Sequence, residues 1–380
     1  MESGSKWVLL SWLFVDRIVY TLNWLSISPA QPFIASEFGL SFTSLGLLGT
    51  VFLVGIGTFQ IPAAVLATKY GAKKIALLGF FLSSSFAGLC GLAPNFETLL
   101  LLRFLTGVFL SFFFGPGITF FTPLFTAREK GIALGVYNAG FHAGTLLAIG
   151  LWPTLISVIG WRNGLLLPGV MGLFLTLVTY RVSRWVNDVA DPAEFGLSTA
   201  TNPVVLASAL GLGCAGAAWY PLTQFGILYL NSEKGSGFEA AGVLISVLSV
   251  GSLLGAPVSG RLYDMATDRK RLLYILNFSS AAALTVFITT PIELIPLVLF
   301  VLGFLYTAAN SLFYLAPLSV LPENKVAVSV AVVNSVHLLA ASVVPYVFAS
   351  IVESAGYFSA WLVMSVVCGM SLVFIRLLKI

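Results

Sequence analysis

The sequence carries very little charge. Only 9% of its 380 residues are Asp, Glu, Lys or Arg, while 58% are hydrophobic, and a soluble domain carries roughly a quarter charged residues. This composition excludes a soluble globular protein of this length. A membrane core about 30 Å thick needs about 20 apolar residues per helix. Because lipid cannot satisfy backbone polar groups and the apolar runs are too long for barrel strands, we predict an all-α membrane protein.

Cysteine is also scarce. Cys90, Cys214 and Cys368 lie inside apolar runs without metal-ligand or CxxC spacing, so we expect buried thiols. The string from Gly211 to Gly216 matches a dinucleotide-binding fingerprint, but no strand precedes it, so we interpret it as close helix packing. No nucleophile–base pair, metal cluster or cofactor motif remains. We therefore predict no catalytic residue, no metal, no cofactor and no enzyme.

Basic residues are few and unevenly placed. The formal net charge is +4, and no basic run with interleaved aromatic residues points to nucleic acid.

Cutting at charges, glycines and prolines gives twelve apolar segments, about 7–30, 43–68, 73–93, 97–124, 130–157, 163–183, 204–230, 239–263, 271–290, 294–320, 325–350 and 357–378. With the N-terminus inside, fifteen Lys and Arg residues fall on the cytoplasmic side. This pattern predicts twelve transmembrane helices in the cell (inner or plasma) membrane, with both termini cytoplasmic. The first run has no small-residue cleavage site after it, so we expect it to stay as a helix.

The second part of the chain repeats features of the first. The longest polar stretch predicts a cytoplasmic linker at 187–202 between two six-helix bundles, 1–186 and 203–380. An ungapped offset of 196 residues matches five pairs: Gly46 with Gly242, Lys73 with Arg269, Lys74 with Lys270, Asn138 with Asn334, and Gly160 with Gly356. A single register that contains glycines, a basic pair and an intramembrane asparagine predicts two pseudo-symmetric bundles made by duplication.

Several short motifs resemble those of the major facilitator superfamily. Gly260-Arg-Leu-Tyr-Asp264, followed by Arg269, resembles the GxxxD loop signature and its basic cluster. In the matching first-half loop, Ala and Thr replace the Gly and Asp. Arg103-Phe-Leu-Thr-Gly107 resembles the RxxxG motif of helix four, and Gly160-Trp-Arg162 the GWR ending of helix five. The resemblance covers nearly the whole chain. It implies the major facilitator fold, a conformational latch at Gly260, Asp264 and Arg269, and a working monomer.

A second resemblance concerns the subfamily. Val15-Asp16-Arg17, Gln60-Ile-Pro62 and Arg103 are similar to the organic anion:cation symporters, where such an Asp takes part in proton coupling and the Arg in anion binding. Leu110 stands where that family has an acidic residue, and Asp16 lies farther from the Glu37-Phe-Gly39 segment than the pattern has. Nitrate carriers share the Asn-Gly-rich fifth helix, but they need arginines on helices two and eight that this chain lacks.

Polar side chains lie deep in the predicted helices. Counted at 1.5 Å per residue from the lysine at each cytoplasmic end, Arg17, His142 and His337 lie about 16 to 18 Å into the membrane. That depth is the midplane, where carriers bind their substrates between the two halves. Helical phase places further polar groups beside them. The predicted substrate-binding residues are Arg17, Tyr20, Asn138, His142, Tyr306, Asn310, Asn334 and His337.

A charge at the bilayer centre costs at least a few kcal/mol, so Arg17 needs a partner or a substrate. We hypothesise that Arg17 binds the anionic group of a small solute and that the neighbouring amides and imidazoles supply hydrogen bonds. Asp16 would exchange a proton and pair alternately with Arg17 or Arg103, which makes Asp16 and Arg103 the predicted proton-coupling residues. A structural salt bridge, and histidines that only bond neighbouring helices, remain alternatives.

These features favour a secondary carrier that moves a small organic anion together with protons. Its predicted partners are the solute, protons and the lipid bilayer, and anion exchange without proton movement is a close variant. Drug or metabolite efflux is the alternative function, although the stretch from Gly140 to Pro153 lacks the Gly-Pro signature of such antiporters. A non-transporting sensor on a carrier scaffold is a third interpretation.

Overall fold

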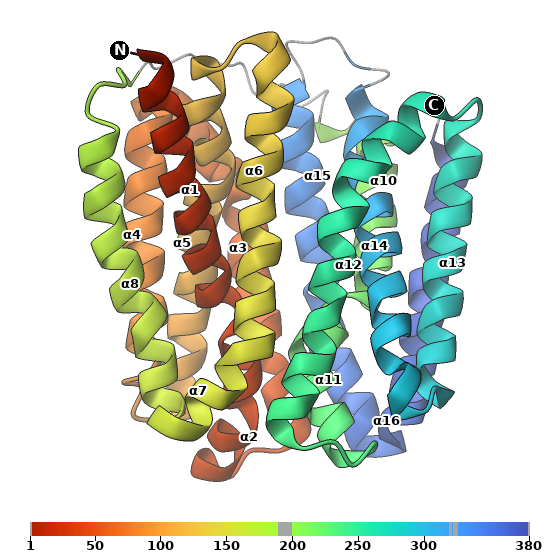
Figure 1. Cartoon of the computed structure of the whole chain (residues 1–380). Helices are drawn as coiled ribbons and strands as arrows, with labels where there is room; N and C mark the ends of the chain where they lie inside the picture. Colours follow the sequence, from red (N-terminus) through yellow and green to blue (C-terminus); the bar gives the residue numbers. More distant parts are fainter. Residues whose placement is uncertain (1, 189–199, 319–320, 322–325, 379–380) are drawn as a thin grey trace.

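The computed structural model describes residues 2–188, 200–318, 321 and 326–378, and its regular elements are helices (Figure 1). The first half of the chain contains α1 (Glu2–Leu25), α2 (Ile27–Phe38), α3 (Phe42–Tyr70), α4 (Ala72–Cys90), α5 (Phe96–Phe121), η1 (Thr122–Leu124), α6 (Ala127–Leu146), the π-helical η2 (Leu147–Leu151), α7 (Trp152–Ile159) and α8 (Trp161–Val182). The second half contains α10 (Pro203–Ala215), η3 (Gly216–Ala218), α11 (Tyr220–Ser232), α12 (Phe238–Met265), α13 (Arg269–Thr289), η4 (Ile292–Leu294), α14 (Ile295–Leu318), α15 (Val326–Ala341) and α16 (Val343–Leu377).

Eleven stretches in the described part of the chain are long and apolar enough to cross a membrane. The last, Val328–Leu377, has 50 residues, and as one straight helix it would be about 75 Å long, more than twice the bilayer core. Gly356 divides it, because its φ of 78° is not helical. The stretch therefore folds back on itself and supplies two crossings. The predicted all-α membrane fold with twelve crossings is confirmed.

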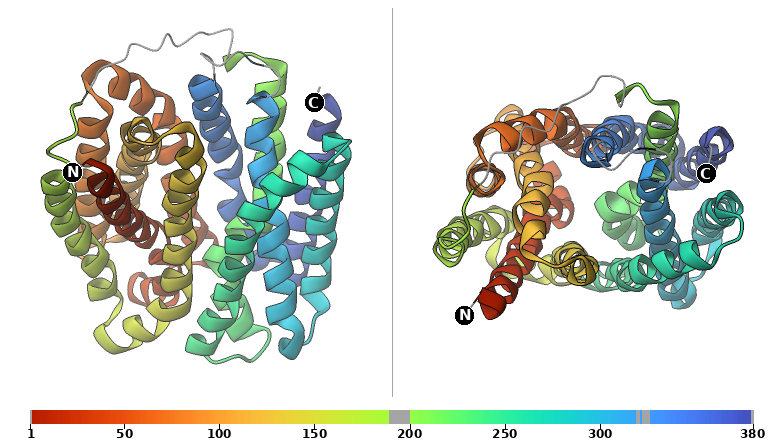
Figure 2. Two further views of the ribbon diagram at one scale, coloured as in Figure 1. Left: turned by 45° about the horizontal axis from the view of Figure 1, so that its top comes forward. Right: turned by 90° about the horizontal axis from the view of Figure 1, so that it is seen from above.

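The two halves of the chain lie side by side, as the view from above shows (Figure 2). Along their boundary α3 packs against α15 and α16, α6 packs against α12, and α2 packs against α11. The turns after the fifth helix of each half have the same backbone conformation: Gly160 has φ 80° and ψ 156°, and Gly356 has φ 78° and ψ 169°. These residues were paired by the 196-residue offset, so the predicted pseudo-symmetry is confirmed in the backbone.

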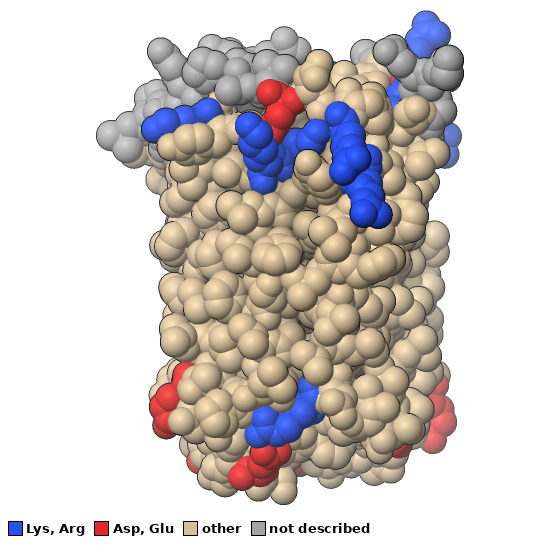
Figure 3. Space-filling view, turned by 90° about the vertical axis from the view of Figure 1, so that its left-hand side faces the viewer, with Lys and Arg blue, Asp and Glu red and all other residues tan. Residues whose placement is uncertain are grey.

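Charged side chains mark the two ends of the molecule. The end where both termini lie, here named the basic end, carries Lys6, Lys73, Lys74, Arg128, Lys130, Arg181, Arg184, Arg269, Lys270 and Arg271. The opposite end, here named the acidic end, carries Glu37, Glu97, Glu233, Glu239, Glu293 and Glu353. On the face shown in Figure 3, a belt without charged residues separates the two ends.

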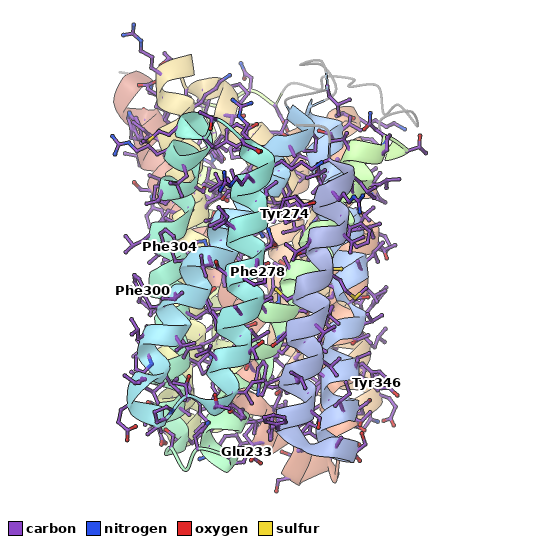
Figure 4. The ribbon with its side chains drawn as sticks, turned by 90° about the vertical axis from the view of Figure 1, so that its right-hand side faces the viewer. Glu233, Tyr274, Phe278, Phe300, Phe304 and Tyr346 are labelled. Carbon is purple, nitrogen blue, oxygen red and sulfur yellow. The ribbon has the colours of Figure 1, made fainter. Side chains whose placement is uncertain are left out.

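Large apolar side chains point outward along the opposite face (Figure 4). Phe278 is 64% exposed and Tyr346 is 42% exposed. A soluble protein rarely leaves contiguous apolar surface in water, but lipid covers such a surface without cost. The belt is therefore the membrane-facing surface.

The loops at the basic end are only partly described. The predicted boundaries 1–186, 187–202 and 203–380 stay a prediction, because 189–199 lie outside the described residues. Gly260 and the side chain of Asp264 also lie outside what the structure describes, so of the predicted latch only the Arg269 side chain is placed, with its guanidinium 4.3 Å from the ring centre of Tyr263. In the first half, where the latch motif is degraded, the Asp188 carboxylate accepts the backbone N–H groups of Lys73 and Lys74 at the start of α4.

Candidate functional site

The first transmembrane helix is broken near its middle. α1 ends at Leu25, because prolines at positions 29 and 32 lack the backbone N–H that a continuous helix needs. Asn23 and Trp24 lie in the last turn of α1, where backbone carbonyls can accept from donors outside the helix. Arg103, buried on α5, donates from Nη1 to Asn23 O and from Nη2 to Trp24 O, each at 3.0 Å. Arg103 thus caps α1 from a neighbouring helix, and its predicted proton-coupling role stays a prediction.

Arg17 lies on α1, two turns before this break, in a cage of aromatic rings. Its side chain is buried, with 5% exposure. The guanidinium carbon is 4.0 Å from the ring centre of Tyr20, 4.4 Å from Phe114, 5.1 Å from Phe141 and 5.4 Å from Tyr137. Its Nε and Nη1 have no hydrogen-bond partner. The rings stabilise the positive charge, and two of the three guanidinium nitrogens remain without a partner.

Asp16 faces away from Arg17, because neighbouring residues of a helix point about 100° apart. It is fully buried, and its Oδ2 accepts a hydrogen bond of 2.7 Å from the hydroxyl of Thr179 on α8. Its Oδ1 has no partner. In this state Asp16 therefore pairs with neither Arg17 nor Arg103. The carboxyl is isolated inside the first bundle, one helix position from the free guanidinium.

The sixth helix element places polar and small residues on different faces. Gly140 and Gly144 pack on α1 so closely that an added Cβ would lie 2.7 Å from a backbone oxygen of α1 at each position. Asn138 is exposed and His142 is half-buried, with its ring 5.6 Å from that of Phe141. This arrangement agrees with the face predicted from helical phase. The close packing of α6 on α1 is what brings Phe141 over the guanidinium.

The second half contributes hydroxyl, amide and imidazole groups. Tyr314 donates to Asn334 Oδ1 at 2.8 Å, and Asn310 Nδ2 donates to the Tyr306 hydroxyl at 3.4 Å. His337 Nε2 lies 3.4 Å from the hydroxyl of Tyr220, and its Nδ1 lies 3.2 Å from the backbone oxygen of Val333, one turn earlier on the same helix. The polar residues that were predicted on the tenth and eleventh helices thus form hydrogen-bonded pairs.

Aromatic rings connect the two sides of the site. Phe141 of the first half lies 5.9 Å from Trp219 of the second half, and Trp219 stacks on Tyr306 at 6.0 Å. Phe114 and Phe141 are not among the residues predicted from the sequence, and Trp219 is an aromatic residue for which packing and substrate contact were equally expected. The available signal was their position in the sequence: Phe141 is next to His142, and Trp219 is the residue before the first residue of α11.

The assembled site holds one cation with free donors on one side and neutral hydrogen-bonding groups on the other. The chain matches the family model described as Major Facilitator Superfamily over residues 13–345. The protein belongs to this superfamily. Its fold agrees: the structure superposes on a bacterial homologue of the human lysosomal transporter Spinster, in an inward-facing and occupied conformation, with a TM-score of 0.83, 17% identity, and 99% of this chain and 97% of that chain covered. The expected major facilitator fold is thereby confirmed.

Curated superfamily relatives are more distant in sequence. The Escherichia coli protein named "Probable L-galactonate transporter" is 30% identical over 45% of this chain and 38% of its own length. The hexuronate transporter of Bacillus subtilis is 22% identical over 72% of this chain and 69% of its own length. The sialic acid transporter NanX of Escherichia coli is 25% identical over 62% and 60%. For the first of these, the matched region spans well under half of the relative.

Proposed function

We propose that this superfamily member is a secondary carrier that moves a small organic anion across the membrane by alternating access, together with protons. The observation that carries the proposal is the Arg17 side chain, which is buried in the membrane-spanning region with two guanidinium nitrogens that have no partner. An unpaired charge at this depth is costly. A carboxylate, which accepts two parallel N–H donors, is the complementary ligand.

The second half of the site indicates the rest of the solute. Hydroxyl, amide and imidazole groups of Tyr314, Asn334 and His337 donate and accept hydrogen bonds but add no further charge. Trp219 and Tyr306 add a flat apolar surface. A carboxylate with several hydroxyl groups, such as a sugar acid, satisfies both sides. The names of the relatives, which mention galactonate, hexuronate and sialic acid, support this chemical class.

Asp16 is the proposed proton carrier. Its Oδ1 has no partner inside the first bundle, and an ionised carboxylate in such a place is costly to keep. Taking up a proton removes the charge, while Thr179 holds the other oxygen in place. Because Asp16 and Arg17 are consecutive, binding of an anion at Arg17 changes the electrostatic field at Asp16. This proximity is the proposed basis of coupling. In this scheme both termini face the cytoplasm.

The test is a thermal-shift screen of the detergent-purified protein with hexuronates, aldonates, simple monocarboxylates, neutral sugars and lipophilic cations, because a ligand that binds the folded state stabilises it. We expect hydroxylated carboxylates to raise the melting temperature. Arg17→Gln should weaken their binding about ten- to hundredfold, since a charged hydrogen bond contributes about 1.5–3 kcal/mol. The exposed Arg128→Gln is the matched control and should bind normally.

The best ligand then enters uptake assays in proteoliposomes with an imposed proton gradient. Uptake should follow the gradient in the wild type and fail in Asp16→Asn. Full affinity in Arg17→Gln would contradict the proposal. Stabilisation by neutral sugars or lipophilic cations alone would favour efflux instead.

A further inference from the structure

Two glutamates of the second half bridge to the first half at the acidic end. Glu353, near the end of the eleventh crossing, accepts the backbone N–H of Thr43 with Oε2 at 2.8 Å. Glu239, in the first turn of α12, accepts the hydroxyl of Ser157 with Oε1 at 2.8 Å. One bond joins α16 to α3, and the other joins α12 to α7. These two contacts between the halves, α16 with α3 and α12 with α7, are here named the seams, and a carboxylate closes each of them.

The two bonds are related by the same offset that relates the halves. Thr43 stands 196 positions before Glu239, and Ser157 stands 196 positions before Glu353. The pair formed by Glu353 and Thr43 thus maps onto the pair formed by Ser157 and Glu239. In each pair a glutamate joins the start of one long helix to the end of another. This correspondence is not expected of scattered surface acids, and it identifies one interface that occurs twice.

Close backbone packing repeats beneath each bond. An added Cβ at Gly46 would lie 2.7 Å from the carbonyl oxygen of Pro345, and one at Gly242 would lie 2.6 Å from the carbonyl oxygen of Ile149. Gly46 and Gly242 are paired by the 196-residue offset, and so are Ile149 and Pro345. The glycines allow the halves to touch at both seams. At each seam, the glutamate bond lies beside the glycine contact.

Both carboxylates also sit at helix N-termini, where backbone N–H groups lack helical partners and the helix dipole favours negative charge. Glu353 supplies this charge to α3 from the opposite half, and the hydroxyls of Ser41 and Thr43 face the same carboxylate. Glu239 lies at the start of its own helix α12. Removal of either charge weakens its seam.

Closing the acidic end also has a cost. Gln31 of α2 is fully buried there, and neither its amide oxygen nor its amide nitrogen has a hydrogen-bond partner. Buried polar groups without partners are unfavourable, and α2 packs against α11 of the second half, so a parting of the halves at this end would let water reach α2. The closed state is therefore opposed from within. Weak bonds at its rim can then decide how often it opens, because a carrier needs two states of similar free energy.

We propose that Glu239 and Glu353 act as a symmetric pair of clasps that keeps the acidic end closed and sets the balance between the two orientations of the carrier. The proposal rests on the alternating-access function above. It does not depend on the identity of the solute. Its test therefore uses no substrate, so a wrong anion assignment and a wrong clasp assignment give different results.

The experiment measures the labelling rate of a thiol at the sealed boundary. Ser28 is 1% exposed and donates to the backbone oxygen of Gln224 in the second half, so Ser28→Cys is a small change at the seam. The native cysteines, Cys90, Cys214 and Cys368, are replaced by alanine. A polar maleimide then reacts only in molecules that have opened, and the rate follows the open fraction even when that fraction is small.

We expect Glu239→Gln and Glu353→Gln each to raise the labelling rate about three- to tenfold, and the double variant by about the product of the two effects. Ser157→Ala removes the donor to Glu239 and should also raise the rate; combined with Glu239→Ala it should add nothing further, since each of these changes removes the same bond. Glu97→Gln, which changes an exposed first-turn glutamate of α5, is the matched control and should leave the rate unchanged. A double variant that reacts at the wild-type rate or more slowly would overturn the proposal.

Discussion

Two buried arginines of the first half should respond in opposite ways to the same substitution. Arg103 donates two hydrogen bonds of 3.0 Å to the carbonyls at the end of α1, and its guanidinium carbon lies 4.4 Å from the ring centre of Phe52. Arg17 has aromatic contacts, but two of its nitrogens have no partner. Arg103→Gln therefore tests structure, and Arg17→Gln tests function.

The expected magnitude follows from these contacts. Arg103→Gln removes two charged hydrogen bonds, at about 1.5–3 kcal/mol each, and the new amide can restore one ordinary bond of about 1 kcal/mol. We expect the free energy of unfolding to fall by about 3–5 kcal/mol, which includes the lost contact with the ring. For Arg17→Gln, the lost ring contacts are offset by removal of a buried charge, so a change within about 1 kcal/mol is expected.

The assay is equilibrium unfolding of the detergent-purified proteins, followed by fluorescence, together with the binding measurement described above. Arg103→Lys keeps the charge and can reach one carbonyl, so its free energy of unfolding should lie between those of the wild type and Arg103→Gln. Equal destabilisation by Arg103→Gln and Arg17→Gln would refute this reasoning. A stable Arg103→Lys that binds the anion but loses proton-driven uptake would instead support the proton-coupling role predicted from the sequence.

Further predictions use matched positions. Gly140→Ala places a methyl group 2.7 Å from a backbone oxygen of α1 and should lower both stability and anion affinity, whereas Gly135→Ala, with nothing within 4 Å, should stabilise α6 by about 0.5–1 kcal/mol in thermal unfolding. Gly160 and Gly356 have space for a Cβ but a positive φ. Gly160→Ala and Gly356→Ala should therefore each lower the free energy of unfolding by about 1–3 kcal/mol, and by similar amounts; a neutral effect at either position would contradict the backbone description. Thr179→Val removes the hydroxyl donor to the buried carboxyl of α1 and should reduce proton-driven uptake about tenfold while solute exchange continues; equal loss of both would indicate a structural role.

The features that the sequence could predict are those that leave isolated marks in an apolar background. Glycines at 160 and 356 mark helix ends because only a residue without a side chain adopts their backbone conformation readily. Arg17 and His337 stand out because charged and titratable groups are rare in membrane helices. The structure then showed the groups that surround them.

The features that could not be predicted depend on which faces of the helices meet. Aromatic residues make up 13% of the chain, so nothing in the sequence distinguishes the Phe114 and Phe141 rings beside Arg17 from rings that face lipid. Thr179 is one hydroxyl among many in apolar helices. The partners of Arg103 are backbone carbonyls, which no side-chain pattern reveals, although the two prolines after α1 indicate a break. Packing geometry, not residue type, decides these contacts.

The scaffold is symmetric, but the candidate site is not. The 196-residue offset pairs Arg17 with Gly213. Gly213 has no room for a side chain, because an added Cβ would lie 2.8 Å from the Cβ of Ala340. The two asparagines of the duplicated pair also differ, because Asn334 bonds Tyr314 while Asn138 is exposed. The symmetry that relates the halves places both seams at the acidic end, so this end closes at two equivalent contacts. Under the proposed function, a cation on one side only would keep an anionic solute with the first half while the halves move, so the contacts that break and re-form would be the neutral hydrogen bonds of the second half, which are weaker than a charged pair.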